Sequence, residues 1–250
     1  GAMAFDRSEA RGVAKPQYPF LVHGLQITVN GGQNAWSDRA ANTVTWLLTM
    51  SSFFAAFLML RKLRGTFLAL CTLSAIILLP MMTIHLSAGY GDIHLVTYGL
   101  LAFLGLAAFL ETRDEEALLL SALMVLGSLW SKSEGLYFVF VPWACALALL
   151  FWKKQITARS AFFATAIPFI LFVPFLVMLI MKGLPLTPHE SDGTFGLKSE
   201  GFAALPHALF GSGSFGVIWY VLPVVIIAVI LKNKKSPSFE LRTSYFALLV

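Results

Sequence analysis

The chain has 250 residues, of which 58% are hydrophobic and 12% are charged, and its mean hydropathy is +0.77. This composition excludes a water-soluble globule, which could not cover so much apolar surface, and favours an integral membrane protein. The net charge of +5 does not indicate a nucleic-acid partner, because many of the cations lie in short flanks of apolar segments, where they set membrane topology.

The first predicted element is an external N-terminal segment, residues 1–39. Within it, residues 18–29 are apolar but too few to cross a bilayer, which takes about 20 residues. Pro16 and Pro19 bracket the start of this stretch, and Gly31-Gly32 follow its end. An interfacial or re-entrant helix therefore fits these residues best.

Residues 40–250 are predicted to form a transmembrane helix bundle with an external loop at 182–212. Seven apolar blocks contain no Asp, Glu, Lys or Arg, and most are long enough to span a membrane. These blocks are residues 40–60, 65–91, 93–110, 117–131, 135–152, 160–181 and 211–231. The block 117–131 is short enough to be a re-entrant segment instead. The predicted fold class is all-α, a polytopic transmembrane helix bundle of about seven spans.

Both ends of the sequence suggest a fragment. An eighth span begins near Thr243 and continues to the last residue. The first residues, Gly1-Ala2-Met3, resemble a protease-cleavage scar, although a truncated reading frame would look the same.

The orientation of the bundle is predicted from the Lys and Arg residues of its short loops, which favour the cytoplasmic side. These cations are Arg61, Lys62, Arg64, Arg113, Lys153, Lys154, Arg159, Lys232, Lys234 and Lys235. The non-cytoplasmic set is then residues 1–39, 88–93, 131–135 and 182–212. All five histidines lie in or beside this set.

Two predicted turns on the non-cytoplasmic face carry candidate site residues. The turn at 89–92 places Asp92 at the membrane surface, although Asp92 could simply cap the helix that follows. The turn at 131–135 sets Lys132 beside Glu134. Lys132 could bind a phosphate head group while Glu134 positions a hydroxyl or holds the lysine. The alternative is a snorkelling lysine and a solvated glutamate.

His85, Asp92 and His94 could also be read as metal ligands brought together by the turn between two spans. Their spacing matches no standard zinc site. Histidines at span ends more often satisfy interfacial hydrogen bonds, so we do not predict a metal here.

Three short motifs resemble a known family. Tyr18-Pro19-Phe20-Leu21 is similar to a Tyr-Pro-x-Leu motif, residues 87–92 to a Ser-Gly-Tyr-Ala-Asp turn, and residues 132–135 to Lys-Asn-Glu-Gly. In this order, on one face and separated by spans, they resemble the bacterial polytopic glycosyltransferases of the GT-C class. This class includes relatives of the protein mannosyltransferases and of the aminoarabinose transferase. The resemblance covers about residues 4–152.

The resemblance implies transfer of a sugar from a polyprenyl-phosphate donor to a glycan, lipid or protein acceptor, at the non-cytoplasmic face of a bacterial inner membrane. It makes Asp92, Lys132 and Glu134 donor or acceptor contacts. Tyr18, His85 and His94 are accessory candidates. The family's catalytic carboxylate would lie upstream of Gly1, so the catalytic residue is unknown. A divalent cation as cofactor stays open.

Two other functions are compatible with the composition. A secondary transporter usually binds its substrate near the bilayer midplane, with broken helices or buried ionisable groups. The absence of Asp, Glu, Lys and Arg from the seven blocks disfavours an ion-coupled transporter. A noncatalytic membrane assembly subunit is the third alternative.

Overall fold

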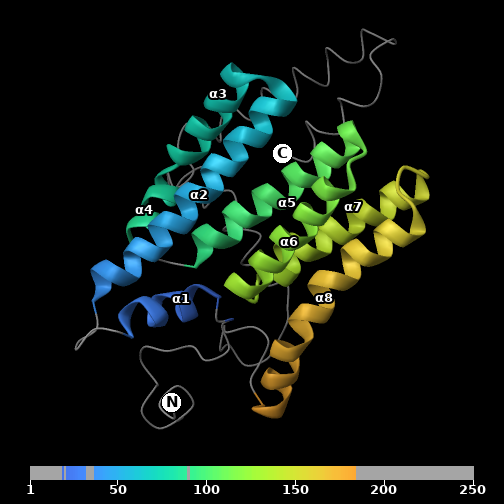
Figure 1. Ribbon diagram of the computed structural model, residues 1–250. Coiled ribbons are helices and arrows are strands. Elements are labelled where there is room, and N and C mark those ends of the chain that lie inside the picture. The colour runs from blue at the N-terminus through green and yellow to red at the C-terminus, as the bar shows by residue number, and fades with distance from the viewer. Residues whose placement is uncertain (1–18, 20, 32–36, 89–90, 184–250) are drawn as a thin grey trace, which may run out of the picture.

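A computed structural model describes residues 19, 21–31, 37–88 and 91–183. Its regular elements are helices throughout, and none of the described residues forms a strand (Figure 1). The elements are α1 (Leu21–Asn30), α2 (Asp38–Arg64), α3 (Thr66–Ile77), α4 (Pro80–Ala88), α5 (Asp92–Thr112), α6 (Glu115–Ser131), the π-helix η2 (Leu136–Phe140), α7 (Val141–Trp152) and α8 (Ala158–Met181). The predicted all-α class is confirmed for this part of the chain.

Three of these helices, α2, α5 and α8, are long and apolar enough to cross a membrane, with 27, 21 and 24 residues. They correspond to the predicted spans at 40–60, 93–110 and 160–181. A continuous apolar helix of this length satisfies all its backbone hydrogen bonds internally, as the bilayer core requires. The chain therefore has the helices of an integral membrane protein.

The predicted count of seven spans is not confirmed. The block at 65–91 is divided into α3 and α4, of 12 and 9 residues. Pro80 begins α4, and a proline ring cannot continue the preceding helix without losing a hydrogen bond and clashing with the backbone. Residues 117–131 lie in α6, which has 17 residues. The block at 135–152 forms a shorter apolar helix that begins as η2 and continues as α7.

The remaining parts of the predicted architecture lie outside the described residues. These are the span at 211–231, the start of an eighth at Thr243 and most of the external loop at 182–212.

The predicted N-terminal helix exists as α1, and its position in the membrane stays a prediction. With 10 residues it is too short to span a bilayer. Its buried residues face α2, where Gln26 Nε2 donates a hydrogen bond to Thr45 Oγ1 at 3.2 Å. Asn30 Oδ1 accepts from the backbone N–H of Ser37 at 2.8 Å and so ties the end of α1 to the start of α2.

Helix α5 lies at the centre of the bundle, between α2 and α6 (Figure 1). It is 61% buried over its apolar window, against 33% for α2 and 28% for α8. A Cβ on Gly105 would lie 2.9 Å from the Cβ of Ser121 on α6, so the glycine permits close packing of the two backbones. Ser121 Oγ also donates to the carbonyl of Ala102 and accepts from Trp143 Nε1 of α7.

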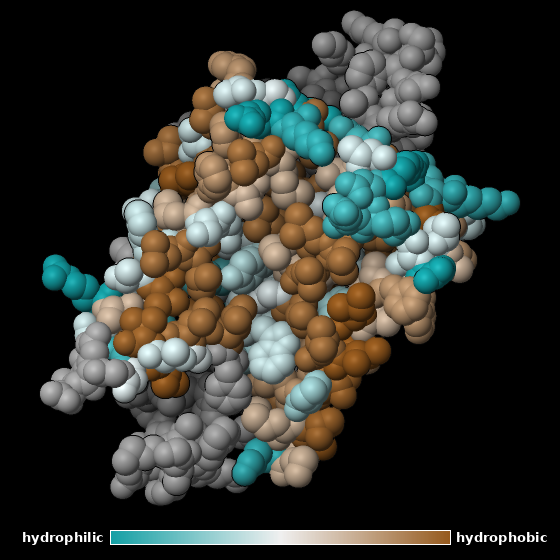
Figure 2. Space-filling model, in the orientation of Figure 1, coloured by the Kyte–Doolittle hydropathy of each residue, from teal (hydrophilic) through white to brown (hydrophobic). Residues whose placement is uncertain are grey.

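Charged side chains gather at one end of the bundle. Figure 2 shows this hydrophilic end and the brown, apolar surface below it. Here the α2–α3, α5–α6 and α7–α8 connections meet, and Arg64 pairs with Glu111 at 2.5 Å. Arg113 donates to the carbonyl of Gln155 at 2.6 Å. This is the end that the distribution of Lys and Arg predicts to be cytoplasmic.

The predicted orientation can be tested by thiol labelling. Cys71 and Cys145 are replaced by alanine to remove background, and a single cysteine then replaces either Arg39 or Lys154, both of which are exposed. In intact cells an impermeant maleimide is expected to label the cysteine at position 39, because the predicted orientation places the start of α2 at the non-cytoplasmic face, and to spare the one at 154. The reverse pattern would invert the assignment of faces. Labelling of both positions after membrane disruption confirms that both thiols react.

Candidate functional site

The candidate site lies at the bundle end opposite the charged end, where α4, α5 and the connection after α6 meet. Asp92 is the first residue of α5. The alternative interpretation, in which Asp92 caps this helix, is wrong, because Gly91 occupies the N-cap position and makes no side-chain capping hydrogen bond. The carboxylate of Asp92 contacts other helices instead.

The turn after α6 presents Lys132 and Glu134. Lys132 ends α6 in an extended conformation, with φ −158° and ψ 141°. The backbone N–H of Gly135 donates to the carbonyl of Lys132 at 2.9 Å and closes the turn. Gly135 packs directly on the end of α6, since a Cβ there would lie 2.6 Å from the carbonyl oxygen of Ser128. The π-helix η2 begins at the next residue, and such segments are frequent at functional sites.

Lys132 lies between two carboxylates. Its Nζ contacts Asp92 Oδ1 and lies 3.4 Å from Glu134 Oε1. Ser133, which is buried, donates a hydrogen bond to Glu134 Oε2 at 3.1 Å and so orients this carboxylate. The side chains of Lys132 and Glu134 are 18% and 15% exposed, whereas that of Asp92 is 38% exposed. Asp92 is therefore the carboxylate most open to a bound molecule.

His85 on α4 completes this group of side chains. Its Nδ1 lies 3.5 Å from Asp92 Oδ2, an ion-pair distance when the imidazole is protonated. Asp92 thus bridges His85 and Lys132. We call His85, Asp92, Lys132 and Glu134 the carboxylate–lysine cluster. With His85 neutral the cluster carries two negative charges and one positive charge.

The other two accessory candidates are not part of the described cluster. His94 is fully buried in α5, two residues after Asp92, and its ring stacks on Tyr98 at 6.1 Å between centroids. Within the part of the chain that the structure describes, neither ring nitrogen of His94 has a hydrogen-bond partner. His94 therefore faces the bundle interior and not the cluster. Tyr18 lies outside the described residues.

His85, Asp92 and His94 do not form a three-ligand group in the described structure. Across the described ranges, no group of three or more His, Cys, Asp or Glu side chains is arranged to hold a metal ion. His85 and Asp92 approach each other, but His94 points elsewhere.

The cluster can supply two kinds of contact. An ammonium group donates hydrogen bonds to phosphate oxygens as a point charge, and carboxylates accept hydrogen bonds from hydroxyl groups. Because Lys132 already contacts two carboxylates, a phosphate would have to share this ammonium with them. The carboxylates also oppose the approach of an anion, so the balance of charges sets the affinity for phosphate.

The contact between Asp92 and Lys132 was missed by sequence reasoning, which paired Lys132 only with Glu134. Asp92 and Lys132 are 40 positions apart. The available signal was that both turns fall on one predicted face and are joined by two consecutive apolar helices, which commonly pack as neighbours. The pairing of α5 with α6 brings the turns together.

Comparison with known proteins gives no assignment. No family model, no curated protein and no solved structure matches this chain. The resemblance to the GT-C class therefore stays a prediction from the three motifs.

Proposed function

We propose that this chain is a membrane glycosyltransferase, or the part of one that holds the donor phosphate. It moves a sugar from a polyprenyl-phosphate carrier to an acceptor on the non-cytoplasmic side. The observation that carries the proposal is the contact of Lys132 with Asp92 and Glu134 at one end of an apolar helix bundle. A lysine and carboxylates at the membrane surface are the parts that this transfer needs.

The chemistry requires few protein groups because a lipid-phosphate sugar already carries its leaving group. The enzyme must orient the acceptor hydroxyl, remove its proton and stabilise the negative charge on the departing phosphate. In this proposal Lys132 meets the phosphate, Asp92 contacts the acceptor or the donor sugar, and Glu134 holds Lys132 in place. His85 orients Asp92. The general base is not assigned to any residue of this chain.

The location of the cluster also fits a donor held by the bilayer. The phosphate of a polyprenyl carrier lies at the membrane surface while its tail occupies the apolar region. Asp92 and Lys132 stand at the ends of α5 and α6, where the apolar helices meet the polar face. Ionisable side chains within membrane-spanning segments face the protein interior or one another and seldom the lipid.

A secondary transporter is the alternative that a specific observation favours. The break between α3 and α4 at Pro80 resembles the discontinuous helices of transporters. The ionisable cluster, however, lies at the end of α5 and not at its middle. A noncatalytic assembly subunit would require neither feature.

Membranes that contain the protein, expressed from its complete gene, test the proposal with a radiolabelled polyprenyl-phosphate sugar. We expect the label to move to a non-lipid or second lipid product, and Lys132→Ala to reduce this transfer by about 100-fold, as for loss of one charge-stabilising donor. Lys153→Ala is the matched control, because Lys153 is an exposed cation at the opposite end. Substrate uptake into sealed vesicles without any transfer would favour the transporter, and full transfer by Lys132→Ala would reject the proposal.

A further inference from the structure

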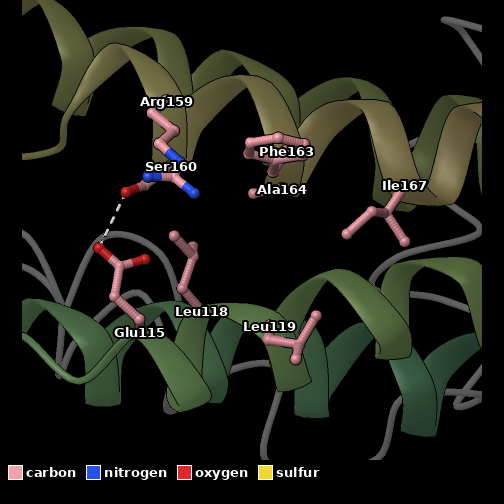
Figure 3. Close-up of a pocket in the computed structure, with 8 residues that line it drawn as sticks. All are labelled: Glu115, Leu118, Leu119, Arg159, Ser160, Phe163, Ala164 and Ile167. Atoms are coloured by element: carbon pink, nitrogen blue, oxygen red, sulfur yellow. Dashed lines mark hydrogen bonds between the residues drawn. The ribbon is translucent and has the colours of Figure 1, made fainter.

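A cavity of about 350 Å³ lies between α6 and α8 (Figure 3). It lies beside the charged end, where α6 begins, and far from the carboxylate–lysine cluster, where α6 ends. Its mouth carries Glu115, in the first turn of α6, and Arg159 and Ser160, in the first turn of α8. Ser160 Oγ donates to Glu115 Oε1 at 2.9 Å and joins the two helices there. The volume is within the range of pockets that hold small molecules, about 300–1,000 Å³.

The wall of the cavity becomes apolar away from the mouth. Leu119 lies one turn beyond Glu115, and Phe163 and Ile167 lie one and two turns beyond Arg159. At 1.5 Å per residue, these side chains are about 6 and about 12 Å deeper along the helices. Leu119 and Phe163 are 48% and 50% exposed, so the cavity opens on the lipid-facing surface. A ligand here meets charge at one end and apolar surface at the other.

The two charged groups at the mouth have no ion-pair partner among the described residues. The guanidinium of Arg159 lies over the ring of Phe163, 5.9 Å from its centroid. From the described residues, Glu115 accepts only the hydroxyl hydrogen bond of Ser160. One positive and one negative group therefore flank the same opening and do not neutralise each other, which suits a ligand that carries both charges.

We infer that this cavity binds a phospholipid whose head group holds a phosphate and a primary ammonium, as in phosphatidylethanolamine. The phosphate meets Arg159, since a guanidinium suits phosphate geometry. The ammonium donates a hydrogen bond to Glu115, and an acyl chain lies against Leu119, Phe163 and Ile167. A net anionic lipid would be opposed by Glu115. A choline head group carries no N–H to donate to this carboxylate.

The proposal predicts a lipid preference that native mass spectrometry can measure on the purified protein. The protein is equilibrated in micelles with equal amounts of dioleoyl phosphatidylethanolamine, phosphatidylcholine and phosphatidylglycerol. We expect the ethanolamine lipid to be retained about tenfold more than either competitor, the difference that one charge-assisted hydrogen bond makes. Equal retention of all three, or preference for the glycerol lipid, would overturn the proposal.

Substitutions at the mouth separate the two contacts. Glu115→Gln keeps an oxygen for Ser160 and is expected to abolish the preference for ethanolamine over choline while leaving phospholipid bound. Arg159→Gln is expected to reduce retention of both lipids about tenfold. Lys153→Gln, an exposed cation that does not line the cavity, is the matched control and should behave as wild type. An unchanged preference in Glu115→Gln contradicts the role of this carboxylate.

Two tryptophan substitutions test whether the lipid binds in this cavity. Leu119→Trp fills the cavity and is expected to release the lipid, whereas Leu120→Trp adds the same bulk at an exposed neighbour that does not line it. Equal retention in both variants would show that the lipid binds elsewhere. Because both side chains face outward, neither change requires repacking of the core. Lipid retention is measured without any sugar donor, so the result is independent of the transferase proposal.

Discussion

The double variant Lys132→Met with Asp92→Asn is expected to fold but to bind a polyprenyl phosphate about tenfold more weakly than wild type. Lys132→Met alone leaves Asp92 and Glu134 facing each other without a cation, which destabilises the protein. Asp92→Asn relieves this repulsion in the double variant and restores the melting temperature. It cannot restore the cation that the phosphate needs, so binding stays weak.

The single variant Asp92→Asn is not expected to weaken the binding of polyprenyl phosphate, in contrast to the double variant. It removes a negative charge that contacts Lys132, so a phosphate no longer competes with this carboxylate for the ammonium. We expect its affinity for a short-chain polyprenyl phosphate to equal or exceed that of wild type. Sugar transfer should still fall, because Asp92 contacts the acceptor or donor sugar in the proposed mechanism.

If the role of Lys132 is purely structural, the same variants are expected to behave differently. If Lys132 serves only to neutralise Asp92 and Glu134, the double variant should recover donor binding together with thermal stability. The measurements are the dissociation constant for a short-chain polyprenyl phosphate and the melting temperature in detergent, each for the wild type and the three variants. Recovered binding in the double variant would contradict a phosphate contact at Lys132.

Much of the helical architecture was predictable because lipid imposes simple rules on a sequence. Blocks without charges predicted α2, α5 and α8 within a few residues, since the bilayer core fixes both length and polarity. The positions at which a helix is interrupted were harder to predict from the sequence. Pro80 was visible in the sequence, but prolines within α8, at positions 168 and 174, do not divide that helix. The outcome at each proline depends on how neighbouring helices satisfy the released backbone groups.

The sequence predicted that the candidate site residues share one face of the bundle. It did not predict which of their side chains are in contact. Topology alone put Asp92, Lys132 and Glu134 on one side of the membrane, because they lie in alternate connections. The register of α5 against α6 decides which atoms meet, and it depends on close packing at Gly105 and Ser121. The direction of the His94 ring could not be predicted from the sequence. Its position near a span end suggested an interfacial role, but the rotation of α5 directs its ring inward.

Gly135→Ala is expected to disrupt the turn that positions Lys132 and Glu134. The added Cβ would lie 2.6 Å from the carbonyl oxygen and 2.8 Å from the carbonyl carbon of Ser128. These atoms belong to the backbone of α6 and cannot rotate away as a flexible side chain could. Overpacking of this kind costs about 3 kcal/mol in the free energy of unfolding. We therefore expect a lower melting temperature in detergent, together with loss of sugar transfer.

Gly24→Ala in α1 is the matched control for this substitution. Apart from its chain neighbours and the backbone of its own helix, no described atom lies within 4 Å of the position that its Cβ would take. Alanine is favoured over glycine in a helix by about 1 kcal/mol, so this variant should keep or raise the melting temperature. The two variants add the same methyl group and differ only in what it meets. If Gly135→Ala melts and transfers sugar like Gly24→Ala, the turn is not packed against α6 as described. In that case the close approach of Lys132 to Asp92 would lose its structural support, since Lys132 belongs to the same turn and meets the start of α5 there.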